Sequence, residues 1–392
     1  MPNRREFVSS AAGLALLNIP YVRAQPTQNR EVRIGMVSEM SGPYAEFGYQ
    51  FSTAIHAFMK RYGDTIDGIK ISVLTRDVAG PNPDLAKRLA QELIVRDNVN
   101  FLGGFGFSPN ALSVAQVSAQ ARIPMVVMNA SALDIPKRSK YVVRTSTTAI
   151  ESAHVIGRWA AAQKVKTAAS LVMDYSAGID AEHAFIKAYE KGGGKMIGTP
   201  IRVPLSSLDY DTYVQKVKDL HPGALFAFTS GGTAGVAFLK AVRNRGIQEA
   251  GIRLIATGDI TIEPVLEAAG DVALGAITAY PYSSAHPSTE NRQFVSDFLA
   301  AGDGKTVPSL LGVSAWDGIA AIYQVIRKLK GNINGDKAME IFEGMHLESP
   351  RGPLTIDTAT RNPVQNIYIR KVERRNQQLA NYEFETINAQ DV

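Results

Sequence analysis

The sequence predicts an α/β protein in which helices cover both faces of parallel sheets. Three observations support this fold class. From residue 31 onward, short apolar segments alternate with longer segments whose apolar residues recur at helical spacing. The chain has 392 residues, enough for two domains of typical size. Its composition, 45% hydrophobic and 20% charged, is that of a globular protein with a sizeable core.

The first residues have the features of an export signal and do not belong to the fold. Arg4 and Arg5 precede a mildly apolar run at 8–19, and a small-residue pattern follows that ends at Ala24. An apolar run of about a dozen residues is too short to span a bilayer and suits a cleaved signal. The paired arginines are typical of the twin-arginine route, and a general secretory signal is an equal alternative. We therefore expect residues 1–25 to be a signal peptide, cleaved near Ala24, that sends the protein to the periplasm.

The chain contains no cysteine, so no disulfide and no cysteine-linked lipid anchor are expected. The net charge is +5, and no long block of like charges occurs. Arg374 and Arg375 belong to the densest basic cluster, which Glu373 interrupts. This cluster indicates a solvated hairpin end, and we expect no binding of nucleic acid.

Strands and helices follow one another in a regular order. Strands are predicted, in sequence order, at 32–37, 69–77, 99–104, 123–129, 167–174, 223–230 and 252–259. Helical spacing lies between them, for example at 46–62 and 83–96. The segment 142–148 is predicted to leave the first domain, and 277–284 to return to it. Six strands end in small or polar residues, and ligands bind beyond the carboxyl ends of parallel strands. These loops therefore predict one shared crevice.

No catalytic signature is present. The six histidines are scattered, and the patterns HExxH, GxSxG and SxxK do not occur. Gly103, Gly104 and Gly106 do not complete a dinucleotide-binding GxGxxG motif. We therefore expect a binding protein and not an enzyme, with no cofactor and no metal.

The stretch GGFGFSPNALS at 103–113 marks one candidate binding loop. Ser108 is a favoured helix N-cap, and Pro109 suits the first helical position. The preceding glycines let a ligand approach the backbone, and the free N–H groups at a helix start attract an anion. A carboxylate fits as well as a phosphate. A helix capped for stability alone is the alternative.

Aromatic residues occur in two of the loops that are expected to form this crevice. Tyr44 and Phe47 lie in SGPYAEFG after the first strand, and Phe105 and Phe107 lie between the glycines. Each aromatic residue could belong to the core or to a ligand wall. Because the four aromatic residues lie in two loops at strand ends, a place in the core and a place in the ligand wall are about equally supported.

These motifs also resemble those of exported solute-binding proteins of branched-chain amino acid ABC transporters, the leucine/isoleucine/valine-binding type. The resemblance covers nearly all of the mature chain and rests on these segments in their order: IGMVSEMSGPYAEFG, FLGGFGFSPNA, IPMVVMNAS, YVVRTST, LVMDYSAG and ATGD. It implies two Rossmann-like lobes with parallel sheets, hinged by three crossovers, in the type I periplasmic binding fold. The implied lobes are 30–146 plus 279–352 and 147–278 plus 353–390.

The resemblance also implies the ligand-binding residues. The loop that holds the ligand carboxylate becomes Phe105, Gly106, Phe107 and Ser108, and a second loop becomes Asn129, Ala130 and Ser131. The acidic partner of a ligand ammonium becomes Asp259. The remaining candidates are apolar or aromatic walls and a residue of the second lobe: Tyr44, Phe47, Trp316 and Tyr175. Trp316 also fits an amphipathic core helix.

Two departures from the family pattern bear on specificity. The carboxylate loop keeps a hydroxyl only at Ser108, and Ala177 stands where a tyrosine is expected, with Tyr175 two positions earlier. More aromatic walls and fewer hydroxyls favour a larger, flatter carboxylate. Asp259 favours a cation or a donor group, or it caps a helix.

We therefore expect the substrate-binding component of an ABC importer, which captures a small amino acid or a related carboxylate, aromatic carboxylates included. Its expected partners are that ligand and a membrane permease, and the protein is expected to be a monomer. A two-lobed periplasmic sensor that signals to a receptor is the alternative.

Overall fold

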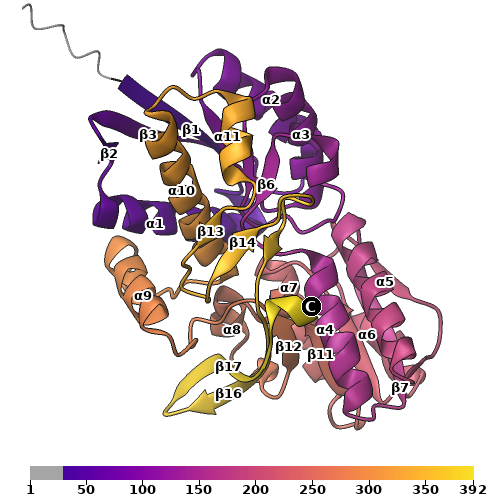
Figure 1. Cartoon of the computed structure of the whole chain (residues 1–392). Helices are drawn as coiled ribbons and strands as arrows, with labels where there is room; N and C mark the ends of the chain where they lie inside the picture. Colours follow the sequence, from indigo (N-terminus) through magenta and orange to yellow (C-terminus); the bar gives the residue numbers. More distant parts are fainter. Residues whose placement is uncertain (1–29) are drawn as a thin grey trace, which may run out of the picture.

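The computed structural model describes residues 30–392, so the expected signal peptide lies outside the described residues. Two sheets, each covered by helices, form two lobes that lie one above the other (Figure 1). This arrangement confirms the predicted α/β fold class. Within the described residues, no helix combines the length and the apolar character needed to cross a membrane.

The first lobe is built on a six-stranded sheet in the order β2-β3-β1-β4-β5-β6. All neighbours are parallel except the β2–β3 hairpin. The strands are β1 (Arg30–Ser38), β2 (Thr65–Ile66), β3 (Ile69–Asp77), β4 (Phe101–Gly104), β5 (Met125–Val127) and β6 (Val142–Arg144). Its helices are α1 (Ala45–Tyr62), α2 (Pro83–Val95), α3 (Ser108–Ala121), α9 (Thr289–Ala301), α10 (Leu310–Leu329) and α11 (Gly335–Phe342).

The second lobe is built on the sheet β17-β16-β12-β11-β10-β7-β8, with β9 also paired to β7. Its strands are β7 (Thr167–Asp174), β8 (Lys195–Met196), β9 (Ile201–Pro204), β10 (Ala224–Phe228), β11 (Arg253–Thr257), β12 (Ile277–Tyr280), β16 (Ile367–Arg375) and β17 (Gln378–Ile387). Its helices are α4 (Ala149–Ala162), α5 (Ser176–Lys191), α6 (Asp211–Asp219), α7 (Gly232–Asn244) and α8 (Glu263–Ala269). The strands β16 and β17 form an antiparallel hairpin, which contains the basic cluster at 374–375.

The chain passes between the two sheets three times within residues 30–392, after β6, after β12 and after β15. The last passage includes a small sheet of β13 (His346–Leu347), β14 (Leu354–Ile356) and β15 (Pro363–Val364). The lobe boundaries remain a proposal, and the one at 279 falls inside β12.

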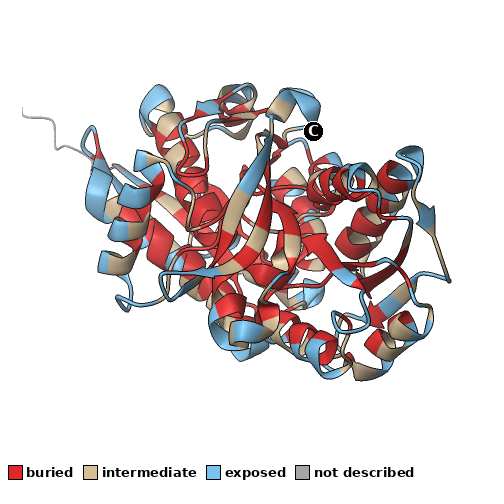
Figure 2. Ribbon diagram, turned by 90° about the horizontal axis from the view of Figure 1, so that it is seen from below, coloured by how far each residue is buried: buried red, intermediate tan, exposed pale blue. Residues whose placement is uncertain are grey.

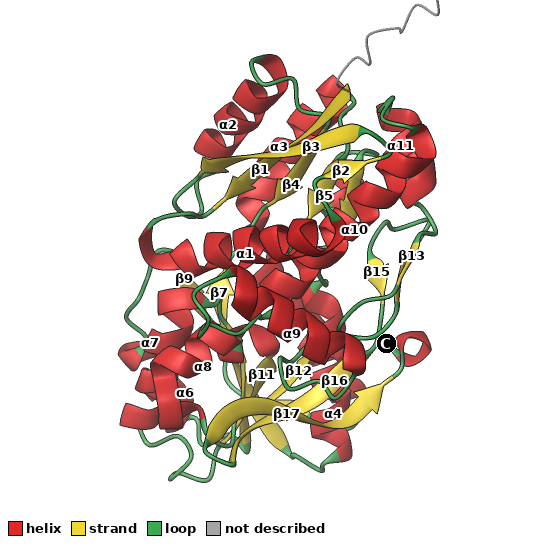
Figure 3. Cartoon of the chain, turned by 90° about the vertical axis from the view of Figure 1, so that its left-hand side faces the viewer, coloured by secondary structure: helices red, strands yellow, loops and turns green. Residues whose placement is uncertain are grey.

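Helices bury both faces of each sheet, as the near-continuous apolar strands require. In β1, the neighbouring residues Met36 and Val37 enter two different core clusters. One cluster joins β1 to α1 and α10, and the other joins it to α2 and α3. Figure 2 shows this buried interior in both lobes, and Figure 3 shows the two sheets from the side.

Candidate ligand-binding cleft

A cavity lies where the carboxyl ends of strands from both sheets face each other. The cavity is narrow: the space between its lining side chains, open solvent included, is about 360 Å³. The first lobe contributes Phe47, Gly106, Phe107, Ser108, Asn129, Ser131 and Leu311. The second lobe contributes Tyr175, Ser230, Gly231, Asp259, Ile262 and Tyr280. The strand-end loops of the two lobes therefore form one crevice.

The first turn of α3 forms one end of the cavity. The first amide groups of a helix have no partner within it, so this end attracts negative charge. The expectation that Ser108 is the N-cap is wrong, because α3 begins at Ser108 and Phe107 is the N-cap residue. The Ser108 Oγ instead accepts a hydrogen bond from the Ala132 N–H at 3.2 Å. Its own hydroxyl hydrogen can still point to a ligand.

The Asn129 side chain fixes the glycine loop from the neighbouring strand. Its Nδ2 donates a hydrogen bond to the Gly106 carbonyl oxygen at 2.8 Å. Ser131 lines the same side of the cavity. Ser108, Asn129 and Ser131 therefore gather around one end of the cavity, next to the α3 N-terminus.

Phe105 and Ala130 lie behind this loop and do not line the cavity. Phe105 is fully buried in the core cluster that includes α2 and α3, and Ala130 packs in the same cluster. The Ala130 N–H donates to the Phe105 carbonyl oxygen at 2.9 Å. Phe105 has a left-handed φ of 70°, and its side chain is buried in the core behind the loop. Of the two phenylalanines in the glycine loop, only Phe107 therefore lines the cavity.

Phe47 and Phe107 form an aromatic wall of the cavity. Their rings are stacked, with centroids 5.6 Å apart and an interplanar angle of 21°. Tyr44 supports this wall from outside the cavity lining, with its ring edge against Phe107 at 4.7 Å. A flat apolar ligand would find a preformed wall here.

The second lobe contributes a half-buried acid, Asp259, to the cavity. Asp259 accepts hydrogen bonds from Thr257 Oγ1 at 2.8 Å and from Tyr280 OH at 3.0 Å. Burial raises the pKa of Asp259, and the Thr257 and Tyr280 hydrogen bonds oppose that effect. Since Ile262 is the N-cap residue of α8, Asp259 does not cap that helix.

Tyr175 and Tyr280 complete this polar wall. Burial is the main cause that raises the pKa of both phenols well above the ordinary value, and the negative charge of Asp259 adds to it. The guanidinium of Arg370 lies over the Tyr280 ring, 5.0 Å from its centroid, and is itself buried. The wall thus offers a ligand the Tyr175 hydroxyl as a donor and the Asp259 carboxylate as an acceptor, because the Tyr280 hydroxyl already donates to Asp259.

Trp316 lies in the core of the first lobe and does not line the cavity. Its ring packs edge-on against Phe58 at 5.0 Å and against Phe294 at 5.1 Å. These contacts place Trp316 on the face of α10 that packs against α1 and α9, as expected for the amphipathic core helix that its sequence also suggested.

Five residues that line the cavity were not among the candidates from the sequence: Ser230, Gly231, Ile262, Tyr280 and Leu311. Ser230 and Gly231 belong to the TSGGT loop after β10, which the strand-end rule had already marked. Tyr280 ends β12 in the same way. Ile262 and Leu311 have no local signal, because an isolated apolar residue in the sequence is more often part of the core.

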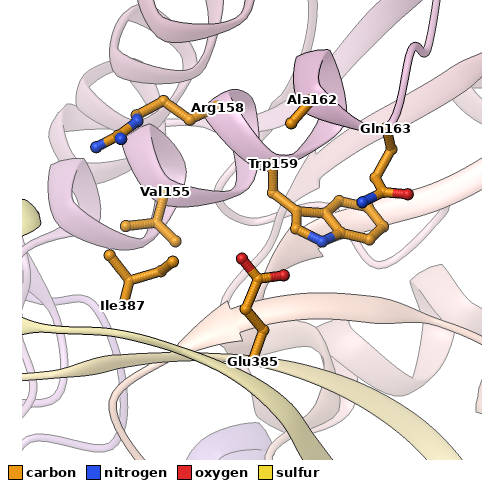
Figure 4. A pocket seen from close by; sticks show the side chains of 7 residues that line it. All are labelled: Val155, Arg158, Trp159, Ala162, Gln163, Glu385 and Ile387. Carbon is orange, nitrogen blue, oxygen red and sulfur yellow. The ribbon is translucent and has the colours of Figure 1, made fainter.

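A second hollow lies on the outside of the second lobe, between α4 and β17 (Figure 4). Its walls combine Val155, Trp159 and Ile387 with the oppositely charged Arg158 and Glu385. Among the described residues, its lining comes from the second lobe alone, so lobe closure would not enclose a ligand there. Among residues 30–392, no three His, Cys, Asp or Glu residues are grouped as a metal site would require.

Comparisons with known proteins agree with this geometry. Residues 31–378 match the family described as "Periplasmic binding protein". The chain is 39% identical, over 88% of both chains, to a Leu/Ile/Val-binding protein homolog 6 of Brucella melitensis. A leucine-binding protein LivK from Thermotoga maritima, 17% identical with a TM-score of 0.80, shares the fold.

Two solved structures are more similar. A solute-binding protein of an ABC transporter from Rhodopseudomonas palustris BisB5, in complex with 3,4-dihydroxybenzoic acid, is 41% identical with a TM-score of 0.88. The match covers 92% of this chain and 98% of that one. Another from R. palustris HaA2, in complex with p-hydroxybenzoic acid, is 37% identical with a TM-score of 0.89, over 92% and 97% of the two chains. The chain thus belongs to the periplasmic binding protein family and is a substrate-binding component of an ABC transporter of the type I fold.

Proposed function

We propose that this protein captures a hydroxylated aromatic carboxylate, of the 4-hydroxybenzoate type, for import. One observation carries the proposal. The cavity has an anion-attracting helix end on the first lobe and the hydrogen-bonded Asp259–Tyr280 pair on the second, with the Phe47–Phe107 wall beside it. A ring with a carboxylate at one end and a hydroxyl at the other matches this arrangement.

At the first lobe, the ligand carboxylate would accept hydrogen bonds from the backbone at the α3 N-terminus and from the hydroxyls of Ser108 and Ser131. At the second lobe, the phenol would donate to Asp259 and accept from Tyr175. A hydrogen bond to a charged acceptor is stronger than one to a neutral acceptor, so Asp259 favours a ligand with a ring hydroxyl. The two relatives from R. palustris, with hydroxybenzoates bound, support this ligand class.

An α-amino acid is the second candidate, and Asp259 is the observation that favours it. Its carboxylate could accept from an ammonium group as well as from a phenol. The Brucella relative, named as a Leu/Ile/Val-binding homolog, supports this alternative. Against it, the wall of Phe47 and Phe107 favours a flat ring over a branched aliphatic side chain.

A binding panel distinguishes the two candidates. Protein purified from the periplasmic fraction is titrated calorimetrically with 4-hydroxybenzoate, 3,4-dihydroxybenzoate, benzoate and leucine. We expect the hydroxybenzoates to bind with a Kd of about 1 μM or tighter, and benzoate to bind more weakly. Binding of leucine without binding of any benzoate would replace this proposal with the amino-acid alternative.

We further propose that the protein is a monomer that delivers its ligand unchanged to a membrane permease, without catalysis and without binding nucleic acid. The proposed export signal is cleaved near Ala24. Mass spectrometry of the periplasmic protein tests the cleavage site, and sedimentation tests the oligomeric state. Chromatography of the released ligand tests catalysis, because an enzyme would return a changed compound.

A further inference from the structure

Glu39 is a fully buried acid directly beneath the glycine loop. It follows the last residue of β1, and its side chain is 0% exposed. Asn110, in the first turn of α3, donates a hydrogen bond from Nδ2 to Glu39 Oε1 at 3.1 Å. Among the described residues, Glu39 Oε2 makes no hydrogen bond of ordinary geometry, although the Gly106 backbone lies close enough to influence the carboxyl group. A buried polar atom without a partner is uncommon and calls for a functional explanation.

The unpartnered oxygen of Glu39 points to Gly106, which lines the cavity. A Cβ atom at Gly106 would collide with Glu39 Oε2, and it would also come within 2.6 Å of the Phe47 ring. The carboxyl group therefore occupies the space that a side chain at 106 would need. Gly106 is required here so that this acid can lie against the floor of the carboxylate end.

Asn110 ties this acid to the start of α3. Its Nδ2 also donates to the Gly80 carbonyl oxygen at 2.9 Å, and its Oδ1 accepts from the Asn82 N–H at 2.9 Å. Asn110 is itself fully buried. Its amide is therefore held in one orientation, with its donor toward Glu39.

No cation compensates Glu39 within the described part of the chain. The charged group that influences it is Asp77 at the end of β3, and it is also negative. Burial raises the pKa of Glu39 to about 8, against the opposing effects of its own backbone, the Asn110 side chain and the Gly106 backbone. At pH 7 the group is consequently mostly protonated.

We propose that Glu39 is a positioning residue that keeps the carboxylate end of the cleft free of fixed negative charge. As a neutral acid it fixes the loop through Asn110 and Gly106, and it leaves the α3 N-terminus to compensate one charge, that of the ligand. This inference rests on the proposed function only in requiring a carboxylate ligand. An ionised Glu39 would place a second negative charge beside the first, and the half-charge of a helix N-terminus cannot balance both.

The consequence is an affinity that falls as Glu39 ionises. If ligand binding requires the neutral acid, the Kd of 4-hydroxybenzoate should be about fourfold higher at pH 8.5 than at pH 6.5. The substitution Glu39→Gln keeps the shape and cannot ionise, so its Kd should lack the fourfold rise that Glu39 causes over this range. The phenol of the ligand contributes equally to both proteins, and the ratio of the two Kd values removes its effect.

Glu46 provides a matched control. It lies seven residues further on, in the first turn of α1, and faces Gly232 at the start of α7 on the other lobe. It is a second largely buried acid, whose pKa burial raises to about 7. The Glu46→Gln variant should retain the rise in Kd between pH 7.5 and 8.5 that Glu39→Gln loses.

The outcomes separate the two proposals. Binding by the wild type at pH 6.5 tests the proposed function, and its absence would overturn both. Binding with parallel pH profiles for wild type and Glu39→Gln would overturn this inference alone. If Glu39→Gln does not fold, calorimetry of the wild type in buffers of different ionisation enthalpy replaces it. We expect uptake of about half a proton on binding at pH 8, and no uptake would overturn the inference.

Discussion

Thr233 Oγ1 donates a hydrogen bond to the Pro43 carbonyl oxygen at 3.1 Å and thereby joins the start of α7 to the loop before α1 on the opposite lobe. A second contact of this kind is the hydrogen bond from the Leu133 N–H to Asp180 Oδ2 at 2.9 Å. Both join residues of different lobes across the cleft. The structure therefore represents the closed arrangement, which these bonds favour over an open one.

The substitution Thr233→Val tests this contribution to closure. It removes the hydroxyl but keeps the branched shape, so the closed state should lose about 0.5–1.5 kcal/mol. We expect the Kd to rise about two- to tenfold, mainly through faster ligand dissociation, because dissociation requires opening. Stopped-flow fluorescence measures both rate constants. An unchanged dissociation rate would show that this bond does not stabilise the closed state, and an unchanged Tm without ligand serves as the control.

Asp259→Asn tests the acceptor at the second lobe. The amide retains an oxygen for Thr257 or Tyr280 but loses the charge that strengthens a hydrogen bond from a ring hydroxyl. We expect the affinity for 4-hydroxybenzoate to fall about tenfold or more, and the affinity for benzoate to change less than about threefold. Calorimetric titration with both ligands measures the difference. An equal loss for both would mean that Asp259 supports the fold of the cleft and does not contact the hydroxyl.

The ligand-free protein should become less stable as the pH rises, through Glu39. Its pKa in the folded chain, about 8, lies above the ordinary value of 4.5, so folding favours the protonated form. The stabilisation is complete below pH 4.5 and is lost progressively as the pH rises through 8. The shift corresponds to about 3–5 kcal/mol in the free energy of unfolding. Urea unfolding of wild type and Glu39→Gln at pH 5, 7 and 9 measures it as a growing difference between the two, and a constant difference would contradict it.

The fold could be predicted from the sequence because its signals are local. Apolar segments of strand length between helical repeats identify parallel sheets, and small residues after each strand mark the crevice. What lines the crevice depends on side-chain direction, which no local pattern contains. Phe105 and Phe107 look equivalent in the sequence, yet the left-handed φ of Phe105 sends its ring into the core. Trp316 likewise satisfied two patterns, and packing against Phe58 and Phe294 decided between them.

Glu39 shows the same limit of sequence analysis, here for a residue that no sequence pattern singles out. In the sequence it is one acid among many, next to a turn, and acids near turns are mostly exposed. Its burial becomes apparent only when β1, the glycine loop and α3 meet in space, because Gly106 and Asn110 are distant from it in the chain. Functional residues whose role depends on such convergence cannot be found from spacing alone.

Phe107 and Trp316 form a matched pair that separates the cleft from the core. Both are buried aromatic residues of the first lobe, and replacing either with leucine should cost about 1–3 kcal/mol in the free energy of unfolding. Phe107 lines the cavity beside Phe47, so Phe107→Leu should also raise the Kd for 4-hydroxybenzoate about tenfold, through loss of ring contact. Trp316→Leu should leave that Kd within about twofold, since its ring contacts Phe58 and Phe294 and not the cavity. Titration calorimetry and thermal unfolding of both variants measure the two effects separately. A large loss of affinity in Trp316→Leu would return Trp316 to the ligand wall, whereas a loss in Phe107→Leu alone supports the aromatic wall of Phe47 and Phe107.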